Sequence, residues 1–409
     1  MVYICRVITF NMKKFDINDL LSSVFNDENE LDIKVLFDEK LVEYNLSKTK
    51  ALKILNIDKD VFDEIVSGTA KQPSLINVIK ISQFIEIEIN DVVKSILKNQ
   101  SVENIASVEK ANKATFILKH FDVKMLTKMG FFINTNDVDI LINRVLDFFG
   151  YKSILEYEND FAIPLFSKSK RTFSDKMKDF WIKSAYQSFK TINNPNEYNR
   201  ESLKELIVKI KPYSQDVNSG LYTVCKALYN IGITVIFQNQ LPTTQVRGGT
   251  FVVNGKPCIV ITDLFKKYPT IWFTLLHELN HVLFDLEVIT NTNYHLSGEN
   301  DLFLIEDKAN NFAKDFFFSQ DKFLYIKPYI DNKFLVAKFA KENEIHASFI
   351  YSAFAYYQSE LYGKNYYGAF KDLYPNYTDA LIKLQPITWG EESLKKVSEK
   401  IKLIFELNS

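Results

Sequence analysis

Apolar side chains recur every three or four residues along most of this chain, the spacing of helices that bury one face. In the region 101–215 this spacing predicts four helices, and breakers such as Gly150, Pro164 and the Asn193-Asn194-Pro195-Asn196 run separate the apolar segments. The predicted helices are Ser107–Phe121, Asp137–Phe149, Ser174–Thr191 and Asn199–Lys211. Residues 391–406 predict a further amphipathic helix with a solvated charged face.

A different pattern covers residues 249–262. β-branched residues flank Asn254-Gly255, a pair typical of a tight turn, and this predicts a β-hairpin. Its strand could offer an edge to an extended peptide, or the hairpin could merely cover the core. The fold class predicted for the whole chain is therefore mainly α with a small β-sheet.

Near the N-terminus, residues 46–92 predict a compact helical domain. Ser47 or Thr49 can cap a helix that runs through Leu55, and Asp58 can cap a second helix through Val66. Gly68 ends the second helix, and Pro73-Ser74 opens a third over Leu75–Ile85.

Composition narrows the function classes. The chain has 409 residues and a net charge of −1, which gives no reason to expect bulk attraction to nucleic acid or membranes. Three cysteines in no C-x-x-C spacing form no disulfide framework and fit a reducing cytosol, and no apolar run reaches transmembrane length. We expect a cytoplasmic protein of two to four domains.

The strongest chemical signal is His277-Glu278-Leu279-Asn280-His281, an H-E-x-x-H motif inside the apolar run 271–286. On a helix, residues four apart share one face, so the two imidazoles can bind one zinc ion. Glu278 is the candidate general base for a zinc-activated water. The alternative is a buried helix whose histidines are satisfied by ordinary hydrogen bonds.

A zinc site needs a third ligand. Asp285 lies on the same helical stripe but about 12 Å from His277 along the axis, too far to share the ion. Glu287 has the spacing of a metzincin ligand, yet Phe284 stands where that class needs a glycine. Glu306 is the better candidate, because Ala309 and Ala313 on its stripe would let the second helix lie close. A solvated glutamate at a helix N-terminus is the alternative.

Residues 290–300 are predicted to form a polar loop between the two candidate zinc helices. The side chains that could stabilise an oxyanion are Tyr294, His295, His346 and Tyr351. For each of them a purely structural role is the alternative. His120, alone on a helix, is interpreted as structural.

These motifs together resemble a known family. The order is a hairpin, then WFTLLHELNH, then about 25 residues, then E-x-x-A-N-x-F-A beginning at Glu306. This is similar to the ImmA/IrrE-type metallopeptidases of bacteria and phages, particularly those fused to a Cro/repressor-type (XRE) helix-turn-helix domain. The resemblance covers residues 225–355 and the N-terminal module.

The resemblance implies an α+β zincin-like metallopeptidase domain in which His277, His281 and Glu306 bind zinc and Glu278 acts as general base. It also implies cleavage of protein regulators, or antitoxin-like regulation in toxin–antitoxin and defence operons. The sequence departs from the family pattern where Asn280 replaces the usual glycine and Lys308 replaces a common acidic residue, and Ser319 falls near where a proline is frequent.

The N-terminal module has an unusual charge for a DNA-binding domain. Residues 40–92 contain seven lysines, no arginine and eight acidic residues. The presumed recognition helix carries Asp60, Asp63 and Glu64, which would repel phosphates. DNA binding and partner docking therefore both stay open. The candidate phosphate contacts are Lys48, Lys50, Lys53 and Lys71.

The predicted organisation has five parts. They are an N-terminal extension (1–33), a helix-turn-helix domain (34–100), a helical middle domain (101–215), the metallopeptidase domain (216–365) and a C-terminal helical segment (366–409). We expect a homodimer with zinc as cofactor, a protein substrate, operator DNA as a further candidate partner, and no membrane association. The alternative function is a non-catalytic DNA-binding or antitoxin-like protein that uses the zincin fold as a scaffold.

Overall fold

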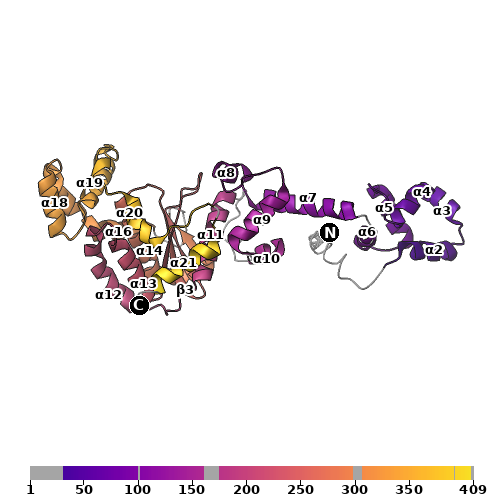
Figure 1. Cartoon of the computed structure of the whole chain (residues 1–409), viewed down its shortest axis with the longest axis horizontal. Coiled ribbons are helices and arrows are strands. Elements are labelled where there is room, and N and C mark those ends of the chain that lie inside the picture. The colour runs from indigo at the N-terminus through magenta and orange to yellow at the C-terminus, as the bar shows by residue number, and fades with distance from the viewer. Residues whose placement is uncertain (1–30, 100–101, 161–174, 298–305, 391, 407–409) are drawn as a thin grey trace, which may run out of the picture. The chain divides into compact units, whose positions relative to one another are not determined.

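The computed structural model describes residues 31–99, 102–160, 175–297, 306–390 and 392–406 (Figure 1). The chain divides into two compact units, Met1–Phe116 and Ile117–Ser409, and helix α7 (Val102–His120) contains the boundary between them. The finer five-part division stays a prediction. Residues 1–30 of the predicted N-terminal extension lie outside the described residues.

The predicted fold class is confirmed, because the described chain is mainly helical with one four-stranded mixed sheet. None of the described helices combines the length and the apolarity that a bilayer crossing needs.

The first unit contains a run of short helices with one apolar core. Three of them have the predicted bounds, and the local signals explain why. The side chain of Ser47 accepts a hydrogen bond from the Lys50 N–H at the start of α3, and that of Asp58 accepts from the Asp60 N–H at the start of α4. The helices are α2 (Ile33–Glu43), α3 (Lys48–Leu55), α4 (Lys59–Val66), α5 (Leu75–Ile85) and α6 (Ile89–Lys98).

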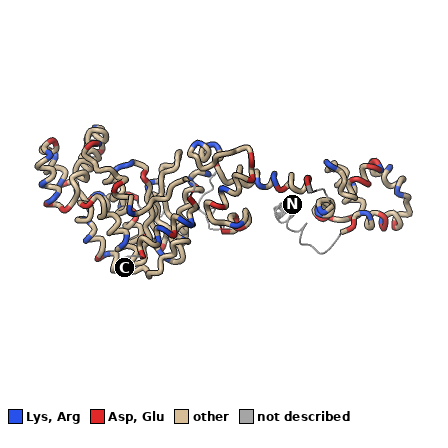
Figure 2. Tube along the Cα trace, viewed as in Figure 1, with Lys and Arg blue, Asp and Glu red and all other residues tan. Residues whose placement is uncertain are grey.

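Charges of both signs alternate along this unit (Figure 2). Lys48 forms an ion pair with Asp63 of α4, with 2.6 Å between Nζ and Oδ1. Lys40 pairs with Glu86 at 2.7 Å. The carboxylate that would repel a phosphate therefore neutralises one of the candidate phosphate contacts.

The sheet of the second unit contains the predicted hairpin. β2 (Gly248–Val253) and β3 (Lys256–Thr262) pair antiparallel, and positive φ angles at Asn254 (52°) and Gly255 (75°) make the turn between them. β1 (Thr234–Gln238) pairs parallel to β3, and β4 (Tyr294–Leu296) pairs antiparallel to β2. Neither outer strand was predicted.

Two expectations are corrected here. The segment 290–300 is not only a polar loop, because Tyr294, His295 and Leu296 form the buried strand β4. The hairpin also has no free edge for a peptide, since the strand order β1-β3-β2-β4 places a neighbour on each side of both hairpin strands. The interpretation of the hairpin as a peptide-binding edge is therefore wrong.

Alternation along β2 assigns the two faces of the sheet. The Thr250 hydroxyl contacts Glu278 of helix α14 (Tyr268–Phe284). The ring of the next residue, Phe251, packs on Phe189 of helix α11 (Lys176–Ile192). Because successive strand residues point to opposite faces, α14 and α11 cover opposite sides of the sheet.

Helix α16 (Glu306–Phe318) packs along α14, and its Ala309 and Ala313 are fully buried, as the small-residue stripe predicts. The C-terminal helix α21 (Leu394–Glu406) packs on α11 and α9 (Val138–Phe149), so the end of the chain belongs to the same unit as the middle segment. The other described helices of this unit are α8 (Val123–Lys128), α10 (Ile154–Asn159), α12 (Arg200–Ile210), α13 (Gly220–Asn230), α15 (Leu286–Thr292), α17 (Gln320–Ile326), α18 (Lys333–Glu342), α19 (Ala347–Tyr362) and α20 (Tyr377–Leu381).

Candidate metal centre

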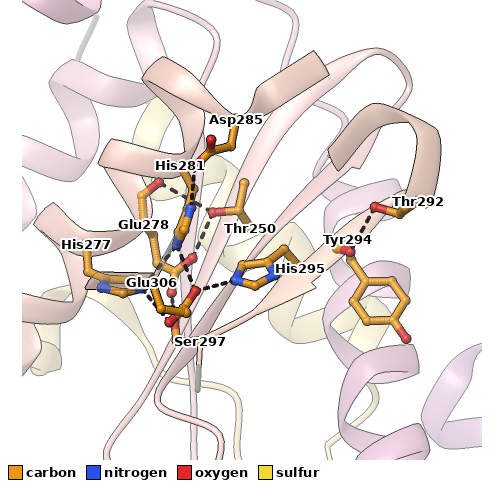
Figure 3. A network of polar contacts seen from close by, with 10 residues as sticks. All are labelled: Thr250, His277, Glu278, His281, Asp285, Thr292, Tyr294, His295, Ser297 and Glu306. Carbon is orange, nitrogen blue, oxygen red and sulfur yellow. Dashed lines mark hydrogen bonds and ion pairs between the residues drawn. The ribbon is translucent and has the colours of Figure 1, made fainter. Parts of the chain in front are cut away.

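The H-E-x-x-H motif lies in the buried middle of α14 (Figure 3). Helical periodicity puts His277 and His281 on one face, with 3.1 Å between their Nε2 atoms. His281 and Glu278 have no exposed surface, and His277 is only 3% exposed. Buried polar groups are costly unless paired or ligated, so this cluster needs a chemical explanation.

Glu306, the first residue of α16, brings its carboxylate to the two imidazoles. Its Oε1 lies 3.2 Å from His281 Nε2, and its Oε2 lies 3.4 Å from His277 Nε2. One ligand atom from each of the three residues fits within 4.8 Å of the others. Two helices far apart in the sequence therefore meet in one His-His-Glu group that could hold a metal ion.

The separations of these atoms suit a tetrahedral ion. Zinc binds nitrogen and oxygen at about 2.0–2.1 Å, and in a tetrahedron the ligand atoms are then about 3.3–3.4 Å apart. The observed separations of 3.1, 3.2 and 3.4 Å are close to this value. The donor set therefore fits zinc in distance as well as in chemical type.

Asp285, the C-cap of α14, orients one imidazole. Its Oδ2 lies 2.7 Å from His281 Nδ1, so the second ring nitrogen of His281 is held by a carboxylate. Metal-binding histidines commonly have such a partner, which fixes the ring and raises its basicity. His277 differs, since its buried Nδ1 has no hydrogen-bond partner among the described residues.

The electrostatics of the centre favour a cation. Burial lowers the pKa of His281, but hydrogen bonds to Asp285 and Glu306 outweigh it and raise that pKa to about 10. Burial also opposes ionisation of Glu306, yet hydrogen bonds with three histidines hold the pKa of its carboxyl well below the usual range. Positive charge is stabilised at the point where a metal would bind.

His295 is the one predicted oxyanion candidate that lies in this centre. Its Nε2 is 2.7 Å from Glu306 Oε1, and its ring is 4.7 Å from that of His281. The neighbouring Tyr294 points away from this cluster (Figure 3). Its ring stacks on that of Phe251, on the other face of the sheet. The geometry therefore favours His295 as the residue that orients the Glu306 carboxylate.

The structure places the remaining two oxyanion candidates in other contacts. His346 caps helix α19, with its Nδ1 2.8 Å from Ser348 Oγ and its ring against Tyr268. Tyr351 packs on the ring of Phe370. None of the contacts described for these two residues joins them to the His-His-Glu group.

Glu278 is held from the sheet side by two hydroxyls. Thr250 Oγ1 on β2 donates to Glu278 Oε2 at 2.8 Å, and Ser297 Oγ, directly after β4, donates to Glu278 Oε1. Each carboxylate oxygen keeps a second lone pair, so the group can still accept a proton. Gly248 makes room for this arrangement, because a Cβ there would lie 3.0 Å from Glu278 Oε1 and 2.9 Å from Val260 O.

The contributions of Thr250, Ser297 and Gly248 to the site were not predicted from the sequence. Their side chains or backbone reach Glu278 only because β2 and β4 pair beneath α14, and no local pattern encodes that pairing. The role of Asp285 could have been predicted from the sequence. It stands four residues after His281 on the same face, a spacing that excludes a shared metal ligand but suits a hydrogen bond to the imidazole.

Replacing Asp285 with asparagine is expected to weaken zinc binding about 10- to 100-fold, the usual cost of removing a carboxylate partner from a ligating histidine. The amide keeps the shape and can still accept from His281 Nδ1, but the negative charge is lost. Competition with a chromogenic chelator measures the affinity. Glu287→Gln, an exposed charge on the adjacent α15, serves as control, and equal affinities for the two variants would refute this role.

The chain matches no protein-family model, no curated protein and no solved structure. The site is accordingly assigned from its own geometry. It is a buried group of two histidines and one glutamate that could hold a metal ion, with a second buried glutamate beside it on the same helix.

Proposed function

We propose that the protein is a zinc-dependent metallo-endopeptidase that cleaves a protein regulator. The observation that carries the proposal is the buried His277, His281 and Glu306 group with Glu278 next to it on α14. Two imidazoles and one carboxylate are typical ligands of catalytic zinc, and three protein ligands leave a fourth position open. Calcium and magnesium prefer sites made only of oxygen ligands.

The roles of the residues follow from their contacts. A bound zinc ion would supply a Lewis acid that acidifies a water molecule and polarises the scissile carbonyl. Glu278 accepts the proton of the attacking water and then passes it to the leaving amine. Thr250 and Ser297 keep the Glu278 carboxylate in one orientation, Asp285 keeps the His281 ring in place, and His295 orients Glu306.

The resemblance to ImmA/IrrE-type peptidases supports a regulator as substrate over bulk protein. The spacing from the H-E-x-x-H helix to Glu306 agrees with that family, and so does the helical N-terminal unit. Asn280, which replaces the family's glycine, is buried at 6% exposure, so it does not project into open solvent. A binding role for that N-terminal unit would fit a regulatory peptidase that is recruited to its target.

A digestion experiment tests the activity. Zinc-loaded protein should cleave members of a proteome-derived peptide library, and mass spectrometry should detect new termini that are absent after treatment with a chelator. Re-addition of zinc should restore them. A preparation that contains one zinc per chain yet produces no new termini in peptides or in folded lysate proteins would contradict the proposal.

Thr250→Val is expected to lower kcat about tenfold with little change in KM or zinc content. Valine has the shape of threonine but leaves Glu278 Oε2 without its hydroxyl donor, and losing a hydrogen bond to a buried charged group costs about 1–3 kcal/mol. Thr250→Ser keeps the hydroxyl and should retain most of the activity. If both variants lose activity equally, the effect comes from packing and Thr250 is not a positioning residue.

A second candidate function, partner docking by the N-terminal unit, is favoured by the Lys48–Asp63 ion pair. That contact pairs a candidate phosphate ligand with an acid of α4, while Asp60 and Glu64 of the same helix stay exposed and would repel phosphates. Titrating the full chain with the DNA upstream of its gene at several salt concentrations separates the two alternatives. Affinity that falls steeply with salt would show phosphate binding, whereas no measurable binding would favour a protein partner.

A further inference from the structure

A small hollow lies beside the N-terminal half of α14. It encloses about 200 Å³, including space open to solvent. Its walls come from Arg247 directly before β2, the end of β3, the turn into α14 and the first turns of that helix. The residues that line it include Arg247, Asp263, Lys266, Lys267, Thr270 and Thr274.

The hollow is electropositive. Among the described residues, no ion pair involves Arg247, Lys266 or Lys267. The carboxylate in the wall, Asp263, is occupied by the protein, since Oδ1 accepts from the Gln240 N–H at 2.7 Å and Oδ2 accepts from the Tyr377 hydroxyl at 3.4 Å. Three cations and one internally bonded carboxylate leave an excess of positive charge.

Two of the cations are held by aromatic rings. The Arg247 guanidinium lies over the Phe265 ring at 5.5 Å. Lys267 Nζ lies 5.4 Å from the centre of the Tyr367 ring and 5.6 Å from that of Tyr374, and it donates to the Tyr367 carbonyl at 3.3 Å. These contacts restrict the two long side chains, so less conformational entropy is lost when they bind an anion.

Gly248 lies between the hollow and the proposed general base, Glu278. A Cβ on Gly248 would lie 2.8 Å from Thr274 Cγ2, in the wall of the hollow, and 3.0 Å from Glu278 Oε1. Thr274 also precedes Glu278 by four residues, just over one turn of α14, which is about 6 Å along the axis. An extended peptide advances about 3.3 Å per residue, so a group in the hollow belongs within about two residues of the scissile bond.

We infer that this hollow is a specificity subsite for an acidic side chain of the substrate protein. The inference rests on the proposed peptidase function and names its substrate class. The hydroxyl of Thr274 donates to Thr270 O within the helix at 2.9 Å, so the cations of the wall supply the recognition. Arg247, with a planar fork of donors, is the principal contact for a carboxylate.

The test uses zinc-loaded full-length protein and peptide libraries in which one position at a time is fixed as Glu, Gln or Lys. The wild type should cleave the Glu library about tenfold faster in kcat/KM than the Gln library at one position near the cut. Arg247→Glu should lose that preference and favour Lys at the same position. Lys209→Glu, an exposed charge reversal on α12, should behave as wild type.

A binding measurement separates this inference from the proposed function. Fluorescence anisotropy with labelled Glu and Lys libraries is carried out on Glu278→Gln and on the double variant with Arg247→Glu. A preference for the Glu library that the second substitution reverses supports the subsite, even if no preparation cleaves anything. Cleavage that is indifferent to charge at every position, together with equal binding of both libraries, would overturn the subsite and leave the peptidase function standing.

Discussion

Glu278→Gln is expected to abolish peptide cleavage while the protein keeps its full zinc content. General base catalysis typically contributes about 10²–10⁴-fold in rate, so the loss in kcat should fall in this range or beyond it. The proposed metal ligands His277, His281 and Glu306 are untouched by the substitution. The predicted result is therefore a folded zinc protein that no longer produces new peptide termini.

The surroundings of Glu278 make this variant a sharp test. Glutamine has the same size as glutamate, and the hydroxyls of Thr250 and Ser297 can accept from an amide as readily as they donate to a carboxylate. Circular dichroism and the midpoint of thermal unfolding should stay close to wild type. Glu287→Gln, an exposed neighbour of the same type on α15, is the matched control and should cleave normally.

Each outcome of this experiment has a definite meaning. Undiminished cleavage by Glu278→Gln at full zinc content would exclude Glu278 as the base. Absence of cleavage in both wild type and variant, with zinc bound to both, would favour the scaffold function over the enzyme. Loss of zinc from the variant alone would mean that Glu278 supports the metal centre itself.

Local signals predicted the parts of the fold that depend on neighbours in sequence. Ser47 and Asp58 mark where α3 and α4 begin, because a capping side chain satisfies backbone N–H groups only two or three residues away. The Asn254-Gly255 turn encodes its hairpin in the same way. The relation of His277 to His281 needed only the pitch of a helix.

Contacts between distant segments were not predictable in this way. Strand β4 has three residues, too few for a period-two pattern, and it exists because residues 294–296 pair with Gly249–Phe251. That pairing alone decides that His295 faces the metal centre and Tyr294 faces away. The candidate third ligand needed a further nonlocal fact, the packing of α16 on α14 through Ala309 and Ala313.

The Glu306→Ala variant is expected to lose zinc. This directly tests whether ligands from both α14 and α16 bind the same ion. Removing a ligand should cost more than the roughly 10- to 100-fold that follows loss of an outer partner, so the purified variant should fall from about one zinc per chain towards none after dialysis. The fold should survive, because Glu306 is the terminal residue of its helix and the packing rests on Ala309, Ala313 and Phe317.

The matched control for Glu306→Ala is Asp307→Ala, which removes an exposed acid from the same first turn of α16. This control separates the loss of a metal ligand from the general effect of removing a negative charge at a helix N-terminus. Zinc content by mass spectrometry, with affinity from chelator competition, should place Asp307→Ala with wild type and Glu306→Ala far below both. If Glu306→Ala kept wild-type stoichiometry and affinity, the two histidines would need a different third ligand, and the proposed catalytic geometry could not stand.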